Sequence, residues 1–156
     1  MVELTKYKTR LTENKRVTLE KEIIMEYPEA FSIIRSPEDA AIIGRDYMHI
    51  HEETEEYMYM ICMNNKNRII GIFEISHGTV NSSIVGVREI FQKALLVNAV
   101  CILLIHNHPS GDPSPSKEDI EITKRIMKAG EIVGIGVLDH LIIGDRYVSL
   151  KDKGYI

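Results

Sequence analysis

The chain of 156 residues contains 44% hydrophobic and 27% charged residues, which is ordinary for one soluble globular domain with a sizeable core. Its formal net charge of −4 argues against a protein built mainly to grip a phosphate backbone. No apolar run is long enough to span a membrane, and residues 1–22 lack the apolar core of a signal peptide, so we expect a cytoplasmic protein that binds no membrane.

Residues 1–35 are predicted to form a charged N-terminal arm ahead of one main domain at residues 36–156. The arm shows little apolar periodicity, and its first 22 residues carry six basic side chains against four acidic ones. Such a segment could contact nucleic acid or a partner protein. A solvated, partly ordered terminus is the simpler expectation.

The main domain is predicted to begin with a helix and a β-hairpin. Ser36 is followed by proline and two acids, which is typical of an N-cap and a first helical turn, and the helix is predicted to continue to about Met48. Residues 57–63 form an almost unbroken apolar run that indicates a buried strand, and residues 68–76 supply the return strand. The edge near residues 68–76 could pair across a homodimer.

Two further helices flank a buried strand. After a polar loop at 78–86, apolar residues follow the 3.6-residue period of a helix at Val87, Ile90, Phe91, Ala94 and Leu95. A strand is predicted over 99–105, and a second helix from Lys117 to about Ala129, with Gly130 as its stop. The inner stripe of the second helix is expected to comprise Ile120, Thr123, Ile126 and Met127.

Short strands over 132–138, 141–143 and 147–150 are predicted to close the fold. Because helices and strands alternate, with hairpins at both ends, we expect an α/β sandwich around a mixed sheet. Cys62 and Cys101 lie inside apolar strand-like runs, and we interpret them as reduced core residues rather than disulfide partners or zinc ligands.

The strand over 99–105 runs into two histidines that can share one ligand. His106 and His108 are two residues apart, and in an extended backbone such side chains point to the same side. A glycine and three prolines then break the strand, and Ser116 with Asp119 three residues later has the pattern of a helix capping box. The arrangement can bring two imidazoles and a carboxylate together, which is the usual ligand set of a catalytic zinc site that leaves a fourth position to water.

Each of these residues also has an ordinary structural explanation. A lone histidine on an apolar strand is more often a core residue than a ligand, and an acid in the first turn of a helix is common because of the helix dipole. The pair His49 and His51 lies at the end of the first predicted helix, where residues two apart face different directions, and we interpret it as surface. Only the later pair combines a strand, a stiff turn and a capped helix.

The spacing His-x-His, seven residues, Ser, two residues, Asp at residues 106–119 resembles the signature of the JAB/MPN (JAMM) metalloprotease superfamily. The full sequence of residues 106–116 is similar to that of the RadC family within that superfamily, and the likeness covers residues 36–156. It includes the segments Gly78-Thr79-Val80-Asn81, Val87-Arg88-Glu89-Ile90-Phe91 and Asp139-His140-Leu141-Ile142-Ile143-Gly144.

The resemblance implies roles for the residues of the motif. His106, His108 and Asp119 would hold a zinc ion, although iron, cobalt or nickel suits the same ligands. Ser116 would support the oxyanion of a tetrahedral intermediate, in possible competition with its role as N-cap.

The superfamily also uses an upstream glutamate as general acid and base. Glu56, immediately before the 57–63 strand, is the best match by position, with Glu55 as its immediate rival and Glu74 as a third choice. A glutamate beside a strand is otherwise most often a solvated edge residue.

Three more residues have both a functional and a structural interpretation. Asp112 could be a substitute metal ligand, but it lies between glycine and proline, where aspartate commonly forms turns. His140 could support a metal ligand from behind, although a structural histidine near a turn is the more common case. His77 is interpreted as structural.

The activity implied by the resemblance is zinc-dependent hydrolysis of an amide or isopeptide bond in a peptide or protein substrate. One alternative is a DNA-repair-associated RadC-like protein that acts on or near DNA. The net charge opposes it, and the first 35 residues leave no room for the helix-hairpin-helix module that full-length members of the RadC family usually carry. A second alternative is a non-catalytic partner-binding module, against which stands the complete set of three ligands.

Overall fold

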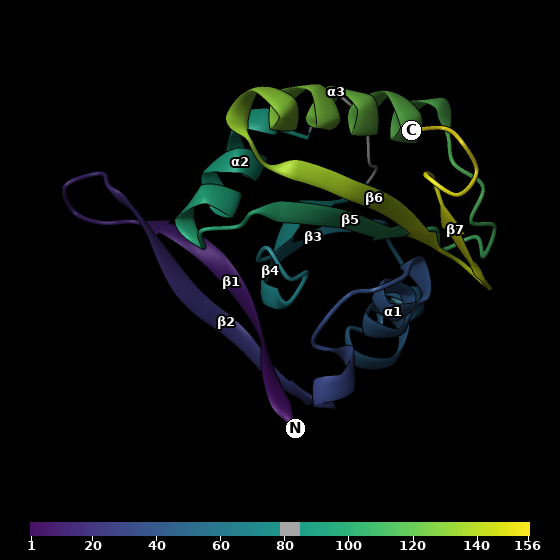
Figure 1. Cartoon of the computed structure of the whole chain (residues 1–156), viewed down its shortest axis with the longest axis horizontal. Helices are drawn as coiled ribbons and strands as arrows, with labels where there is room; N and C mark the ends of the chain where they lie inside the picture. The colour runs from purple at the N-terminus through teal and green to yellow at the C-terminus, as the bar shows by residue number, and fades with distance from the viewer. Residues whose placement is uncertain (79–84) are drawn as a thin grey trace.

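A computed structural model describes residues 1–78 and 85–156, and within these ranges it shows one seven-stranded sheet with helices on both faces (Figure 1). The predicted α/β sandwich around a mixed sheet is therefore confirmed. The strands are β1 (Val2–Leu11), β2 (Val17–Tyr27), β3 (Tyr57–Met63), β4 (Ile69–His77), β5 (Cys101–Asn107), β6 (Gly136–Ile143) and β7 (Tyr147–Ser149). The α-helices of the described residues are α1 (Pro37–Ile42), α2 (Val87–Leu96) and α3 (Lys117–Val133).

The strands lie in the order β2-β1-β4-β3-β5-β6-β7, with β1·β4 and β5·β6 parallel and the other neighbours antiparallel. The predicted hairpin of β3 and β4 is confirmed, and β5 lies on the other side of β3. The register pairs Met58 with His106 and Met60 with Leu104, so the histidine that follows the apolar run extends β5 beside β3.

Two apolar cores lie on opposite faces of the sheet. Helices α2 and α3 cover one face, where Met58, Phe73 and Ile126 are buried together. Helix α1 covers the other face, where Ala41, Ile61 and Ile143 are buried (Figure 1). His106 shares the face of Met58, so it lies under α3, while the neighbouring Tyr59 points to the α1 side.

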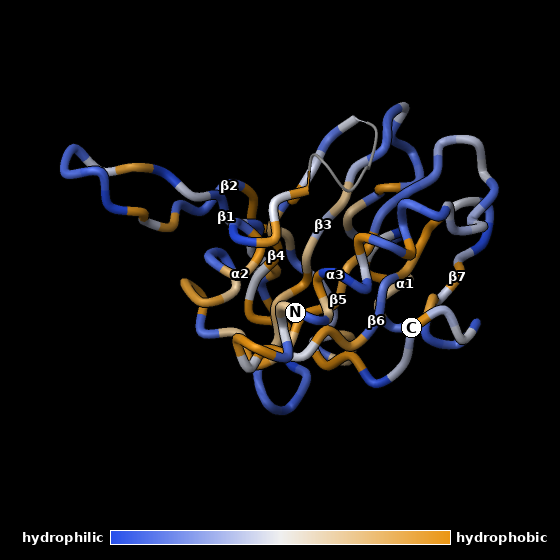
Figure 2. The backbone as a smooth tube through the Cα atoms, turned by 90° about the horizontal axis from the view of Figure 1, so that it is seen from above, coloured by the Kyte–Doolittle hydropathy of each residue, from blue (hydrophilic) through white to orange (hydrophobic). Residues whose placement is uncertain are grey.

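The prediction of a partly ordered N-terminal arm is wrong. β1 and β2 pair along almost their whole length, and β1 joins the rest of the sheet by pairing with β4. Leu4 and Tyr27 from this hairpin are buried in the α1-side core, while its tip projects from the body as a polar loop (Figure 2). The hairpin also occupies the edge of β4 at Ile72 and Phe73, so this part of the edge expected to be available for a homodimer is already paired.

The basic side chains of β1 face carboxylates of β2. Lys6 lies 3.2 Å from Glu22, Lys8 lies 3.8 Å from Glu20, and Arg10 also pairs with Glu20. The excess of basic residues noted in the sequence therefore does not make a continuous positive strip along this part of the hairpin.

The first predicted helix is confirmed with one change of geometry. Ser36 caps α1, and the side chains and backbone N–H groups of Ser36 and Asp39 form a reciprocal capping box. After Ile42 the chain continues as a π-helical turn, Ile43–Tyr47, with Met48 N–H donating to the Ile43 carbonyl over 2.9 Å. Helix α2 is also as predicted, with Ile90, Phe91 and Ala94 buried, whereas Leu95 from the predicted apolar set is exposed.

Helix α3 is longer than predicted. It passes Gly130 and ends at Gly134, which has a φ of 86° and is the true C-cap. Gly130 lies inside the helix, where an added Cβ would be 2.4 Å from the Ile135 carbonyl oxygen. The buried stripe consists of Asp119, Ile122, Thr123, Ile126 and Gly130, so Thr123 and Ile126 were predicted correctly and Ile120 and Met127 were not.

The strands after α3 also differ from the prediction. The segments predicted at 132–138 and 141–143 are one strand, β6, which begins only after the helix has ended. β5 begins and ends two residues later than predicted. The predicted loop at 78–86 and the Gly78-Thr79-Val80-Asn81 segment lie largely outside the described residues. Within the described ranges no helix is both long and apolar enough to cross a bilayer.

Candidate metal centre

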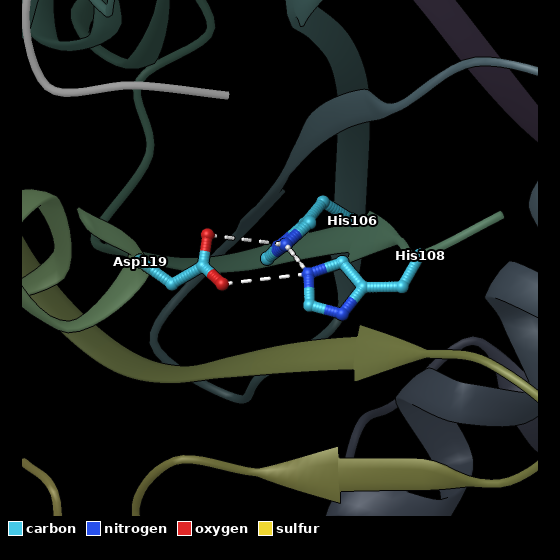
Figure 3. A group of neighbouring side chains, drawn as sticks. All are labelled: His106, His108 and Asp119. Atoms are coloured by element: carbon cyan, nitrogen blue, oxygen red, sulfur yellow. Dashed lines mark hydrogen bonds and ion pairs between the residues drawn. The ribbon is translucent and has the colours of Figure 1, made fainter. Parts of the chain in front are cut away.

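The three predicted ligands meet between β5 and α3 (Figure 3). His106 is in β5, His108 follows the strand by one residue, and Asp119 is in the first turn of α3. His106 Nε2 lies 3.0 Å from His108 Nε2, and the Asp119 carboxylate lies 3.3 Å from His106 Nε2 and 3.4 Å from His108 Nε2. The structure thus brings together the residues that the motif singled out.

The site is enclosed on the protein side and open at His108. The side chains of His106 and Asp119 are 0% and 3% exposed, whereas that of His108 is 13% exposed. His108 Nδ1 lies 2.8 Å from the Asp112 carbonyl oxygen. Because a carbonyl can only accept, this nitrogen carries the hydrogen, and in the neutral ring the lone pair of His108 is therefore on Nε2, toward the other two ligands.

The spacing of the donors fits a metal ion. Donors bound tetrahedrally to one zinc ion are about 3.4 Å apart, given the usual Zn–N and Zn–O distances. The two imidazole nitrogens are 3.0 Å apart, and each is 3.3–3.4 Å from a different oxygen of the Asp119 carboxylate, distances close to that value. Two imidazoles and a carboxylate directed at one point therefore make a group that could hold a metal ion.

Electrostatics of the site also favour a cation. Burial raises the pKa of the Asp119 carboxyl, but its contacts with His106 and His108 outweigh burial and hold the pKa well below its usual range. Burial lowers the pKa of His108, but the hydrogen bonds to Asp119 and Asp112 outweigh it, and the pKa is raised. The Asp119 carboxylate is therefore ionised at neutral pH and supplies a negative charge among the three ligands.

Ser116 is placed as the sequence predicts at the start of α3. Its Oγ accepts the Asp119 backbone N–H over 3.0 Å, and its own backbone N–H donates to Asp119 Oδ2 over 2.8 Å. The capping box that starts the helix thereby also orients one metal ligand. Because the cap uses the Ser116 hydroxyl only as an acceptor, the hydroxyl hydrogen can still be donated elsewhere.

Glu56 immediately precedes β3. It lies two residues before Met58, which pairs with His106, and its charge contributes to the raised pKa of His108. The backbone around Glu56 is held by Asn107: Tyr57 N–H donates to Asn107 Oδ1 over 2.7 Å, and Asn107 Nδ2 donates to the Glu55 carbonyl over 2.9 Å.

The two rival glutamates face elsewhere. The Glu55 carboxylate pairs with His77, whose ring stacks on Tyr57 at 4.1 Å between centroids, so His77 has the structural role expected of it. Glu74 lies opposite Tyr59 in the β3–β4 register, on the α1 side of the sheet and away from His106. The structure thus favours Glu56 by position among the three candidates, and its role remains a prediction.

Other candidates from the sequence have ordinary roles. The Asp112 carboxylate accepts the Ser114 N–H over 3.0 Å and so forms the turn, while its carbonyl orients His108. His49 and His51 lie at the surface beside Glu52, as predicted. Cys62 and Cys101 are free and buried, also as predicted.

The loop that carries His108 is fixed against the β6–β7 turn. His108 N–H donates to the Ile143 carbonyl over 2.8 Å, and Asp145 N–H donates to the Gly111 carbonyl over 2.8 Å. From below, Arg45 of the π-helical turn donates to the Gly144 carbonyl over 2.8 Å. The Arg45 contact joins segments 99 residues apart, which sequence spacing could not have linked to the site.

Behind His106 lies a buried polar pair, of which the sequence indicated only one member. His106 Nδ1 is 2.7 Å from His140 Nε2, and His140 Nδ1 is 2.6 Å from Thr123 Oγ1. Burial holds the pKa of His140 well below its usual value, so its ring is neutral. His140 was considered as a support for a ligand, whereas Thr123 was taken for a core residue because it continues the apolar stripe of α3.

Comparison with known proteins agrees with this geometry. Residues 34–155 match the model of the RadC-like JAB domain family. The chain is also 49% identical over 133 residues to proteins named UPF0758 from Bacillus cereus (strain 03BB102), Bacillus anthracis (strain A0248) and Bacillus thuringiensis subsp. konkukian (strain 97-27), an alignment that covers 85% of this chain and 58% of each relative. The chain thus spans little more than half the length of these relatives. It belongs to the RadC-like JAB domain family.

Proposed function

We propose that this chain is a zinc-dependent hydrolase that cleaves an amide or isopeptide bond in a peptide or protein. The observation that carries the proposal is the convergence of His106, His108 and Asp119 at the spacing of a tetrahedral metal site with one open side. A zinc ion held there would supply Lewis acidity and lower the pKa of water to about 7.

The protein groups around the open side have complementary roles in this proposal. Glu56, beside His108, takes the proton from the attacking water and returns it to the leaving nitrogen. Ser116 donates its free hydroxyl hydrogen to the oxygen of the carbonyl under attack, while its lone pair keeps the helix cap. Asn107 fixes the backbone on both sides of Glu56 and so limits where that carboxylate can reach.

A role in binding DNA has less support. The lysines and the arginine of β1 are paired with glutamates of β2, and the net charge is negative. A protein that gripped DNA through this hairpin would need those cations to be available to phosphates.

The first test is the metal content of untagged protein. We expect close to one zinc per chain in the wild type and almost none in His106→Ala and Asp119→Ala, because each variant removes one of three ligands. His51→Ala, which removes a surface histidine, is the matched control and should keep the metal. A wild-type protein that folds but takes up no zinc at neutral pH would refute the proposal.

The second test separates metal binding from catalysis. Glu56→Gln keeps the size of the side chain and all three ligands, so it should retain zinc. Against a library of amide- and isopeptide-linked substrates, it should lose roughly a hundred- to ten-thousand-fold in rate, the usual contribution of a general acid and base. Zinc in both proteins without any cleavage by the wild type would favour a metal-stabilised partner-binding module.

A further inference from the structure

A chain of three hydrogen bonds leads from His106 back to α3. His106 Nδ1 is 2.7 Å from His140 Nε2, His140 Nδ1 is 2.6 Å from Thr123 Oγ1, and Thr123 Oγ1 is 2.6 Å from the Asp119 carbonyl oxygen. All four residues are buried. The chain starts at one candidate ligand and ends on the backbone of another, and it crosses from β5 through β6 to α3.

The directions of these bonds follow from the last one. The Asp119 carbonyl can only accept, so the single hydrogen of the Thr123 hydroxyl points toward it. Thr123 Oγ1 then has only a lone pair for His140, so His140 Nδ1 must carry the hydrogen. A neutral imidazole has one N–H, and His140 Nε2 is therefore an acceptor.

In its neutral form, His106 has one tautomer that is compatible with these hydrogen bonds. Because His140 Nε2 accepts, His106 Nδ1 is the donor and holds the hydrogen of the neutral ring. The lone pair of His106 is then on Nε2, the nitrogen that faces His108 and Asp119. This is the tautomer that a metal ligand requires at that nitrogen.

We propose that Thr123 is a positioning residue for the metal centre, which acts through His140 to hold His106 in the Nδ1–H tautomer and so keeps Nε2 free to bind a metal. The proposal rests on the metal binding in the proposed function, but not on the substrate or the reaction. Thr123 touches neither the ligand nitrogens nor the open side of the site.

Removing the Thr123 hydroxyl should reverse the direction of the hydrogen bond between His140 and His106. In Thr123→Val, His140 Nδ1–H would be a buried donor without an acceptor, which is costly. Moving the hydrogen to His140 Nε2 avoids this, but His140 then donates to His106 Nδ1. His106 must in turn carry its hydrogen on Nε2, inside the metal site.

The experiment uses the whole 156-residue chain labelled with ¹⁵N in histidine. In metal-stripped protein at mildly alkaline pH, long-range ¹H–¹⁵N spectra report which ring nitrogen of each histidine carries the hydrogen. We expect Nδ1–H for His106 and His140 in the wild type and Nε2–H for both in Thr123→Val. Zinc affinity, measured by competition with a chelator, should fall about 10–100-fold in the variant.

Two further variants separate this effect from packing. Thr123→Ser keeps the hydroxyl and should restore both the tautomers and the affinity, although it removes a methyl group. Ile122→Val removes a buried methylene from the same helix but none of the hydrogen-bonding groups, so it should leave the histidine tautomers and the zinc affinity unchanged. Restoration by serine is not expected if position 123 only fills space.

The proposal is overturned if wild-type His106 carries its hydrogen on Nε2, or if Thr123→Val changes neither the tautomers nor the zinc affinity. The tautomers are read without metal, so they test this inference independently of the proposed function. A wild type that has the expected tautomers but takes up no zinc would refute the hydrolase and leave the hydrogen-bond chain standing.

Discussion

Asn107 joins two strands at the point where their backbone pairing ends. The β3–β5 ladder stops at the pair Met58 and His106, and beyond it the Asn107 amide accepts from Tyr57 N–H and donates to the Glu55 carbonyl. The Asn107 side chain thus forms hydrogen bonds at the start of β3 where the backbone hydrogen bonds between the two strands have ended. The residue between the two histidines thereby anchors the segment that carries Glu56.

Asn107→Ala should destabilise the protein by about 1–3 kcal/mol, because it leaves the part-buried Tyr57 N–H and Glu55 carbonyl without their partner. Urea unfolding measures the loss, and zinc content should stay at the wild-type level because no ligand is changed. Asn65→Ala, at an exposed turn, is the matched control and should be within about 0.5 kcal/mol of the wild type. Equal stability of the two variants would show that the hydrogen bonds of the Asn107 side chain do not stabilise the protein.

At this scale the sequence reveals ligands better than it reveals their supports. His106, His108, Ser116 and Asp119 could be predicted because they are close in the chain and their spacing has a geometric meaning. Asn107 and Thr123 could not, since one contacts a strand fifty residues upstream and the other a histidine on β6. A polar residue inside an apolar stripe was the only available signal for Thr123.

Among the elements, the loop after β5 and the β6–β7 turn are in backbone contact. An added Cβ at Gly144 would lie 2.2 Å from the Gly111 carbonyl oxygen, which leaves no room for any other residue. This contact determines where the loop places His108, whose own N–H is bonded to Ile143. The close approach explains why a glycine ends the Asp139–Gly144 segment.

Gly144→Ala should therefore displace the loop, with a destabilisation of about 1–3 kcal/mol, as for other overpacked sites. Zinc affinity should fall with it, because His108 moves with the loop. Gly136→Ala, at the start of β6, meets no atom within 4 Å and serves as the control. Thermal unfolding and chelator competition on both variants check this, and a zinc affinity unchanged in Gly144→Ala would count against a rigid loop.

The errors in predicting elements have a common physical source. Gly130 looked like a helix stop, yet it is inside α3 because the backbone at Ile135 passes too close for a side chain. β6 was divided into two strands because polar Asp139 and His140 interrupt its apolar run, although both are buried. In each case a contact distant in sequence overrides the local pattern.

For the whole molecule, the N-terminal hairpin is an integral part of the sheet. Its sequence resembled a loose arm because its charged residues pair across the hairpin and few of its residues enter the core. The apolar pattern of one strand gives no sign that β4, far along the chain, will pair with β1. The sandwich itself could be predicted, since it follows from alternating helices and strands.

Deletion of residues 1–27 should expose the edge of β4 and leave the α1-side core without Leu4 and Tyr27. We expect a lower melting temperature and association through the bare edge, measured by thermal unfolding and size-exclusion chromatography. Replacing only the tip, residues 12–16, by Asn-Gly should preserve both properties, because the tip is exposed. A monomeric deletion variant as stable as the wild type would contradict this view of the hairpin.

The π-helical turn Ile43–Tyr47 has a consequence for how this region can vary in length. Such a turn holds one residue more than an α-helical turn, and each residue of an α-helix rotates the chain by about 100°. Within it, Arg45 reaches the β6–β7 turn, beside the loop that carries His108, and Tyr47 packs on Tyr27 of the N-terminal hairpin. Loss of a single residue here would turn one of these side chains away from its partner. A one-residue deletion in this turn would thus be more disruptive than most substitutions. The number of residues in the turn determines whether Arg45 can face the β6–β7 turn while Tyr47 faces the N-terminal hairpin.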